Sequence, residues 1–221
     1  MDVDVAIDRA LAGRVRLGVM SIGGVSVREQ DTALAARVEA ECASLRARFG
    51  GGKSSEVPGT EDARTLYKAL GIDPTKTRPS NEALLRRALK GEPLYRINTL
   101  VDALNLASLR EQLPFGLYDL ERIALPVTLR TGAKGEAYEG IRKGPVQVEG
   151  RPVLADAQGA FGNPTSDSLR TCITLATRRC LVVAYAPAGC SASRLEGVLD
   201  RTAAALIEAC GGTLEARRQL G

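Results

Sequence analysis

The spacing of apolar residues changes partway along this chain, and the change limits the folds open to it. After one early strand-like segment, apolar residues recur every three or four positions up to about residue 123, as on one face of a helix. Beyond it, short apolar runs are separated by Gly and Pro, as in strands joined by turns. Helical spacing returns near the C-terminus. We therefore expect one α+β domain over residues 1–221, with a mixed, mostly antiparallel β-sheet flanked by helices.

The predicted elements begin and end at residues that favour such boundaries. Thr60 and Ser80 are the predicted N-caps of two helices, and Ser193 with Glu196 forms a predicted capping box. We predict helices over residues 29–49, 60–70, 81–90, 98–112 and 193–210. We predict strands over residues 14–19, 127–130, 137–141, 146–148, 153–155, 171–177 and 181–186, the last two as a hairpin. The basic tail after Gly211 is expected to fray.

The chain contains no histidine, which excludes several kinds of site. Ser-His-Asp and Cys-His catalysis and His-ligated zinc all need that side chain. The five cysteines are an odd number without a CxxC pair, which favours reduced, buried thiols and a cytoplasmic location. No apolar run approaches the roughly 18–20 residues of a membrane span, and the acidic N-terminus is unlike a signal peptide. We expect neither a membrane association nor a metal or cofactor.

The net charge of +4 permits an anionic partner without requiring one. A basic cluster stands before the 98–112 helix and consists of Arg78, Arg86, Arg87 and Lys90. The segment Gly50-Gly51-Gly52-Lys53-Ser54 is similar to part of a phosphate-binding loop. The full GxxxxGK[ST] pattern would need a glycine at Ala47 and a strand rather than a helix before it. We therefore predict a flexible loop between two helices.

A stripe of short polar residues follows the predicted 98–112 helix. Asn98, Asp102 and Asn105 fall close together when each residue advances the helix by about 100°. Asn and Asp compete for backbone hydrogen bonds inside helices, so the stripe has a local energetic cost. The functional interpretation is the polar wall of a pocket. The alternative is a second packed layer or a solvated face.

Three stretches between Arg78 and Ile123 resemble the B3/B4 domain in the beta chain of phenylalanine–tRNA ligase. They are RPSNEALLRRALKG, INTLVDALNLASL and LPFGLYDLERI. The resemblance covers about residues 78–186, between a strand–helix flank over 1–77 and a closing helix over 191–211. In the ligase this domain hydrolyses the ester of wrongly charged tRNA. The resemblance therefore implies a freestanding trans-editing hydrolase, an aminoacyl-tRNA deacylase, that binds the acceptor end of tRNA and the attached amino acid.

The implied activity gives the candidate residues their roles. Asp167 is predicted to orient the attacking water, and Ser168 and Thr171 to donate hydrogen bonds to the oxyanion. The predicted amino-acid pocket contains Asn98, Asp102, Asn105 and Gly116, with Asp102 pairing with the substrate ammonium. The predicted contacts with tRNA phosphates are Arg78, Arg86, Arg87 and Lys90.

Each role has a structural alternative. Asp102 would only brace nearby backbone, and Asp167 with Ser168 would form an Asx-type turn. The ligase domain also carries a histidine where this chain has Gly116, so its pocket chemistry does not transfer unchanged. The alternative function is therefore a non-catalytic module that binds tRNA or an amino acid.

Overall fold

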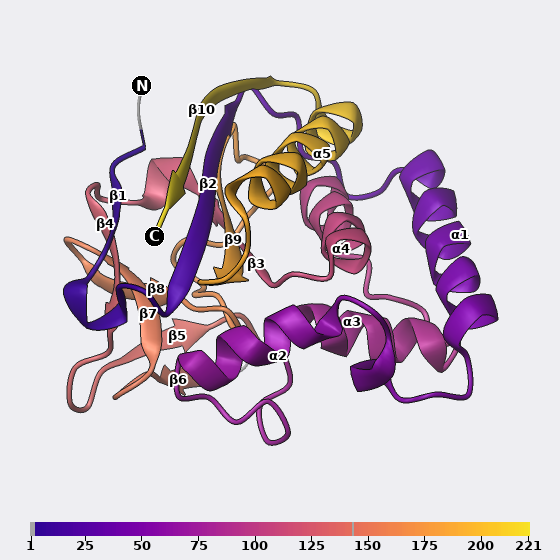
Figure 1. Ribbon diagram of the computed structural model, residues 1–221. Helices are drawn as coiled ribbons and strands as arrows, with labels where there is room; N and C mark the ends of the chain where they lie inside the picture. Colours follow the sequence, from indigo (N-terminus) through magenta and orange to yellow (C-terminus); the bar gives the residue numbers. More distant parts are fainter. Residues whose placement is uncertain (1–2, 143) are drawn as a thin grey trace.

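The computed structural model describes residues 3–142 and 144–221 (Figure 1). Met1, Asp2 and Lys143 of the predicted domain lie outside the described residues. The helices are α1 (Thr32–Phe49), α2 (Thr60–Ala69), α3 (Ser80–Leu89), α4 (Thr99–Glu111) and α5 (Ala192–Cys210). The strands are β1 (Val5–Ile7), β2 (Val15–Gly23), β3 (Phe115–Asp119), β4 (Val127–Thr131), β5 (Ala137–Gly140), β6 (Gly144–Gln147), β7 (Pro152–Asp156), β8 (Gly159–Gly162), β9 (Arg179–Pro187) and β10 (Thr213–Leu220).

The central sheet has the strand order β10-β2-β9-β3 and is antiparallel throughout. Strand β9 lies inside it, between β2 and β3. Both faces of β9 are covered, which explains why its sequence is a continuous apolar run rather than an alternating one. Val182 and Ala184 face one core, whereas Leu181 and Val183 face the other.

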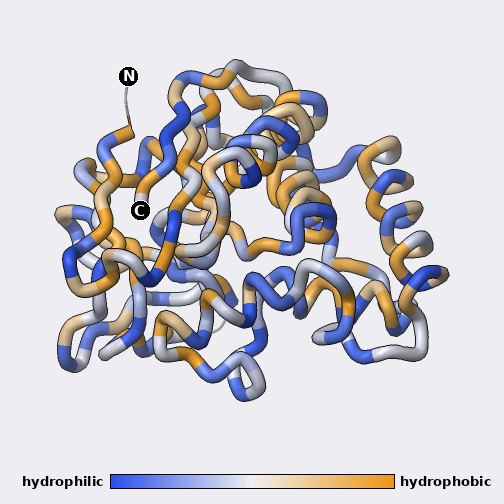
Figure 2. Tube along the Cα trace, viewed as in Figure 1, coloured by the Kyte–Doolittle hydropathy of each residue, from blue (hydrophilic) through white to orange (hydrophobic). Residues whose placement is uncertain are grey.

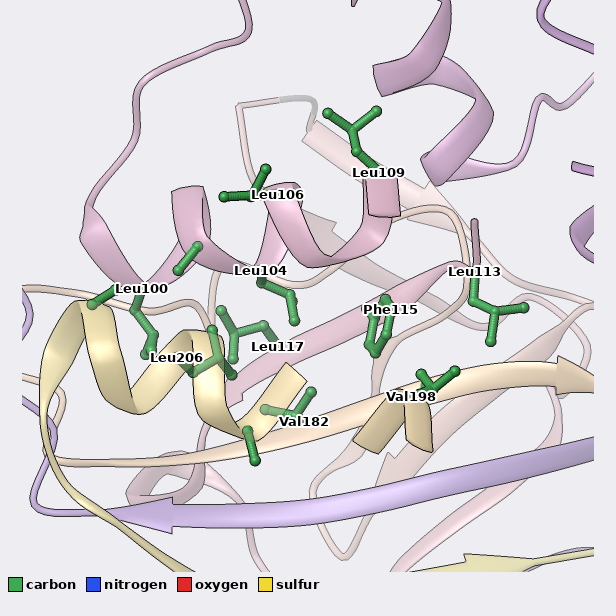
Figure 3. Close-up of a cluster of buried hydrophobic side chains, with 14 of the residues drawn as sticks. Leu100, Leu104, Leu106, Leu109, Leu113, Phe115, Leu117, Val182, Val198 and Leu206 are labelled. Carbon is green, nitrogen blue, oxygen red and sulfur yellow. The ribbon is translucent and has the colours of Figure 1, made fainter. Parts of the chain in front are cut away.

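One face of the central sheet is covered by α4 and α5. Figure 3 shows Leu100 and Leu104 of α4 above Phe115 and Leu117 of β3, with Leu206 of α5 beside them. Helices α1 and α3 pack outside this layer, and orange and blue segments alternate along α1 in Figure 2. The core therefore fixes α4 directly against the strand that follows it.

The other face of the central sheet packs against α2 and a second sheet with the order β1-β4-β7-β8. Strand β1 pairs with β4 in parallel, and the remaining pairs of this sheet are antiparallel. Tyr118 and Phe161 meet edge to face across this core, with ring centroids 4.9 Å apart. The predicted α+β fold with a mixed, mostly antiparallel sheet is confirmed.

Several predicted helix starts are wrong by one to three residues. Asp31 caps α1 by accepting a hydrogen bond from the Leu34 amide, at 2.8 Å. Gly59 and Pro79 stand at the N-caps of α2 and α3 instead of Thr60 and Ser80. Ser191, rather than Ser193, caps α5.

The predicted strand over 171–177 is wrong, and so is the hairpin that contained it. Both edges of β9 are occupied by β2 and β3, so no position remains for a neighbouring hairpin strand. The segment instead forms turns closed by threonine hydroxyls. Thr177 Oγ1 accepts from the Thr174 amide at 3.0 Å and donates to Asp119 Oδ2 at 2.7 Å.

Four strands were not predicted: the short β1 and β8, and the longer β3 and β10. Phe115–Asp119, which none of the predicted helices and strands covers, forms β3 at the edge of the central sheet. The C-terminal tail, expected to fray, forms β10 along β2. Arg217 of β10 forms ion pairs with Glu196 and Asp200 of α5, which gives the basic tail partners that its own sequence lacks.

All five cysteines are free thiols. Within the described ranges, no helix is both long and apolar enough to cross a lipid bilayer.

Candidate functional site

Two adjoining hollows lie between α4, β3 and the segment that follows β8. The smaller has a volume of about 140 Å³ and the larger about 420 Å³. We name them together the Asn105–Asp167 cleft. The residues that line both hollows are Leu104, Asn105, Phe115 and Asp167.

Apolar side chains form most of the wall of the larger hollow. Val101 and Leu104 share a face of α4 because residues three apart are neighbours on a helix. Phe115 and Leu117 point to the same side of β3 because side chains alternate along a strand. The rest of the apolar wall comprises Ile97, Leu169, Cys172 and Ile173, with Ile141 at the edge. An apolar chamber with a few polar groups is the usual composition of a small-ligand site.

Two members of the predicted polar stripe, Asn98 and Asp102, bind the backbone at the start of α4, whereas the third lines the cleft. Asn98 is the N-cap, where its Oδ1 accepts from the Val101 amide at 3.0 Å. Asp102 Oδ1 accepts from the Ile97 amide at 3.0 Å, and burial raises the pKa of this carboxyl. Neither residue is among those that line the described cleft. This geometry favours the bracing alternative, and their substrate-binding roles stay predictions.

Asn105 is the member of the stripe that lines the cleft. Its side chain is half-buried, and none of the described residues hydrogen-bonds to its amide group. An unsatisfied amide in the middle of a helix has a cost in helix propensity without a structural gain. Asn105 is therefore placed to bind a group that enters the cleft.

Asp167 lies at the end of a tightly held loop. Asn163 Oδ1 accepts from the amides of Thr165 and Ser166, at 2.8 and 2.9 Å. Two tyrosine hydroxyls hold the same loop from below: Tyr67 donates to the Pro164 carbonyl at 2.9 Å and Tyr138 donates to the Ser166 carbonyl. The loop thus presents Asp167 to the cleft from a fixed backbone.

Four tyrosines lie within electrostatic reach of the Asp167 carboxylate. Burial is the largest cause that raises the pKa of Tyr67 to about 12. Hydrogen bonds to Thr165 and to the Ser80 backbone oppose this rise, and the charge of Asp167 adds to it. Burial first, and the charge of Asp167 second, raise the pKa values of Tyr118 and Tyr138. Burial is also the largest cause of the raised pKa of Tyr185. At neutral pH these phenols are therefore neutral.

Ser168 and Thr171 lie beneath the cleft. Both are buried, their hydroxyl oxygens are 2.9 Å apart, and the Thr171 amide donates to Ser168 Oγ at 3.3 Å. Neither is among the described residues that line either hollow. Their roles as oxyanion donors stay predictions, and the geometry favours a role in supporting the loop.

Gly116 lies on the face of β3 that points away from Phe115 and Leu117. A Cβ atom at Gly116, or at Gly162 of β8, would collide with the ring of Tyr118. The glycine therefore makes room for a buried tyrosine, and its predicted place in the amino-acid pocket stays a prediction.

Ser80 lines the cleft, although the sequence predicts it to be the N-cap of a helix. Its Oγ atom is buried, has no hydrogen-bond partner among the described residues, and lines the smaller hollow. Ser80 is the first residue of α3, after Pro79. In the sequence, the Pro-Ser pair at a predicted helix start is typical of an N-cap and does not indicate a cleft residue.

The predicted tRNA-binding residues do not all lie together. Arg78, Arg86 and Lys90 line a third, open hollow of about 620 Å³ together with Lys53 and Arg64. We name this hollow the basic pocket. Arg87 turns away from it: its guanidinium lies 4.2 Å from the centre of the Tyr95 ring and donates to the Pro93 carbonyl at 2.8 Å.

Metal chemistry has no candidate ligand set in the parts of the chain that the structure describes. No three His, Cys, Asp or Glu side chains come together there in an arrangement that would hold an ion. The polar side chains that line the cleft are instead the Asp167 carboxyl, the amides of Asn105 and Asn163, several hydroxyls and the Arg142 guanidinium.

Comparison with known proteins identifies the domain. No curated protein sequence matches the chain significantly. A solved structure of an N-terminal fragment of the phenylalanyl-tRNA synthetase beta-subunit from Pyrococcus horikoshii is similar in fold, with a TM-score of 0.53 and 14% sequence identity. The match covers 100% of this chain and 55% of that one, so this chain spans about half of the fragment. A family model described as the B3/4 domain matches residues 62–211, and the chain therefore belongs to the B3/4 domain family.

Proposed function

We propose that this protein acts on tRNA as a trans-editing deacylase, which hydrolyses the ester between a wrongly attached amino acid and its tRNA. The observation that carries the proposal is the placement of Asn105 and Asp167 where an apolar hollow joins a polar one. Membership of the B3/4 family and the likeness to a fragment of a tRNA synthetase support a tRNA-related role.

The two hollows suit two parts of an aminoacyl ester. The larger hollow, with its mostly apolar wall, takes the amino-acid side chain and favours an uncharged, apolar one. The ester group then lies at the junction of the hollows, within reach of Asn105 and Asp167. The smaller hollow, lined by Ser80, Asn163 and Ser166 among others, takes the sugar end and the attacking water.

Asp167 is the proposed general base. It orients a water molecule and accepts its proton while the water oxygen attacks the ester carbonyl carbon. The resulting tetrahedral oxyanion collapses, the bond between carbon and ribose oxygen breaks, and the ribose oxygen takes up the proton. Positioned proton transfer of this kind contributes about 10²–10⁴-fold to a rate. A modest contribution suffices because an aminoacyl ester is already activated.

Asn105 and Ser80 are the proposed hydrogen-bonding groups. Asn105 holds either the substrate α-amino group or the water through its amide. Ser80 Oγ, buried and unpaired among the described residues, donates to the developing oxyanion. In this proposal Ser168 and Thr171 support the Asp167 loop, and Asp102, which braces the start of α4, attracts the substrate ammonium at longer range.

A panel of aminoacyl-tRNAs tests this function, each charged with a cognate or near-cognate amino acid and incubated with the protein or with buffer. Selective loss of an apolar amino acid is the expected result. The absence of acceleration across a broad panel would contradict hydrolysis. It would favour the second function, a non-catalytic binding module in the cytoplasm, which the lack of histidine supports.

A further inference from the structure

We infer that the basic pocket binds backbone phosphates of RNA, and that it holds the strand whose aminoacylated end enters the cleft. The inference rests on the proposed function for the identity of the RNA as tRNA. It adds Lys53 and Arg64 to the RNA-binding residues and removes Arg87 from them.

The cations of the basic pocket come from separate segments. Lys53 is in the glycine-containing loop after α1, Arg64 is in α2, and Arg86 is in α3. Arg78 precedes α3 and Lys90 follows it. The fold thus gathers five positive side chains around one hollow, although no short stretch of sequence contains them all.

Glu82 is the one carboxylate among the described lining residues, and it orients two of the five cations. Its side chain is 3% exposed, and it lies 2.7 Å from Arg64 Nη1 and 3.6 Å from Arg78 Nε. It also accepts a hydrogen bond from Ser54 Oγ at 3.1 Å, which fastens the glycine-containing loop to α3. One buried carboxylate therefore orients two guanidinium groups.

Lys53 and Lys90 are paired only at the surface, with Glu56 at 3.7 Å and Glu92 at 3.9 Å. Exposed pairs of this kind are weak, so both lysines can exchange their partners for a phosphate.

The composition of the pocket favours phosphates over bases. Pro74 and Leu89 are the apolar residues of its described lining, and no aromatic ring there offers a surface on which a base would stack. Glycines at positions 51 and 52 leave the backbone open to close approach. Arg86 takes part in no ion pair with a described residue, so its charge is free to meet a phosphate.

The position of the pocket favours a polymer over a small anion. Ser80 and Leu84 of α3 line the cleft, whereas Arg86 lies on roughly the opposite side of the same helix and lines the basic pocket. A helix is about 10–12 Å across with its side chains, a distance that neighbouring nucleotides of one strand bridge. A strand bound in the basic pocket would therefore bring its terminal ester to the cleft.

The test is the affinity for uncharged tRNA, measured by fluorescence anisotropy over a range of salt concentrations. The variant K53Q/R86Q removes two cations from different sides of the pocket, and K134Q/R151Q removes two exposed cations that are not part of it. Each lost phosphate contact lowers the slope of log affinity against log salt by about one. We expect K53Q/R86Q to bind more weakly with a slope lower by about two, and K134Q/R151Q to match the wild type.

A slope for K53Q/R86Q equal to that of the wild type would overturn the inference. So would inorganic pyrophosphate binding that K53Q/R86Q abolishes while tRNA binding is unchanged, because the pocket would then serve a free anion. The deacylation panel is independent of both results. If the wild type hydrolyses no ester but the slope falls as expected, the proposed function fails and the RNA site stands.

Discussion

The Asn105–Asp167 cleft and the basic pocket lie on two sides of α3 but are built in different ways. Cleft residues such as Leu104 of α4 and Phe115 of β3 belong to the core that is packed between the helices and the central sheet. The basic pocket is lined by long side chains such as Lys53, Arg86 and Lys90, which are exposed. Groups that must be held in a fixed geometry thus lie at the edge of the rigid core. Attraction of a polyanion needs only positive charge at the surface.

The largest expected effect is on the hydrolytic rate, from Asp167→Asn. This change keeps the shape of the side chain but removes the proposed base. We expect the single-turnover deacylation rate to fall by about 10²–10⁴-fold, the usual contribution of general-base catalysis. Affinity for tRNA should stay at the wild-type value because the basic pocket is untouched. Asp4→Asn, an exposed carboxylate in the N-terminal segment, is the matched control and should change neither quantity.

The two asparagines of the polar stripe should respond to alanine in opposite ways. Asn105→Ala should lower the deacylation rate by about ten- to a hundredfold through the loss of one hydrogen bond to a charged or reacting group. It should also stabilise the fold by up to about 0.7 kcal/mol, because alanine is the better helix former. Asn98→Ala should instead destabilise the fold by about 1 kcal/mol through the loss of the N-cap of α4. Urea unfolding with both variants measures the sign, and a less stable Asn105→Ala would contradict a ligand-binding role.

A methyl group behind the cleft should affect stability more than binding. In Gly162→Ala the added Cβ would collide with Tyr118, which is buried beside the Asp167 loop. We expect a loss of about 1–3 kcal/mol in the free energy of unfolding, as for other overpacked sites. The salt dependence of tRNA binding should not change. Gly189→Ala, where an added Cβ meets nothing within 4 Å, provides the control. Equal stabilities of the two variants would show that the core behind the cleft is not tightly packed.

The smallest expected effect is the pH dependence of Asp102→Asn. Burial raises the pKa of the Asp102 carboxyl in the folded protein above its ordinary value of 3.8. The protonated form is therefore the one that folding favours, and wild-type stability falls as pH rises through the raised pKa. Asparagine retains an acceptor for the Ile97 amide and cannot ionise. The variant should match the wild type near pH 3 and exceed it at neutral pH.

The measurement for Asp102→Asn is urea unfolding at a series of pH values, and a difference independent of pH would refute the role of burial. The same variant tests the proposed attraction of the substrate ammonium. A deacylation rate equal to that of the wild type would leave Asp102 with a bracing role alone.

Local signals in the sequence were sufficient for the helices and for most short strands. The spacing of Leu34, Val38 and Leu45 in α1, for example, reflects a face that is buried as expected. Strands β3 and β10 could not be predicted because their pairing partners, β9 and β2, lie far away in the chain. A strand at the edge of a sheet is specified by its neighbour as much as by its own residues.

The candidate site was predictable in its residue types but not in its contacts. The polar stripe on the predicted helix included Asn105, and the resemblance to the ligase domain implied Asp167. Which members of each group face the cleft depends on register and capping. Asn98 caps α4 by accepting from the Val101 amide, and the Ser168 hydroxyl forms a hydrogen bond with the Thr171 hydroxyl. The sequence does not reveal either hydrogen bond. Lys53 and Arg64 also line the basic pocket, because the loop after α1 and the helix α2 both lie against α3 in the fold.

The most direct test of the division between cleft and basic pocket is single-turnover deacylation of the fastest substrate in the panel, with protein concentration varied up to saturation. Wild type, Asp167→Asn and K53Q/R86Q are compared at one salt concentration. We predict that Asp167→Asn lowers the rate constant at saturation, whereas K53Q/R86Q reaches the wild-type rate constant but needs more protein to do so. No acceleration by the wild type over buffer, or equal losses at saturation for both variants, would contradict the account.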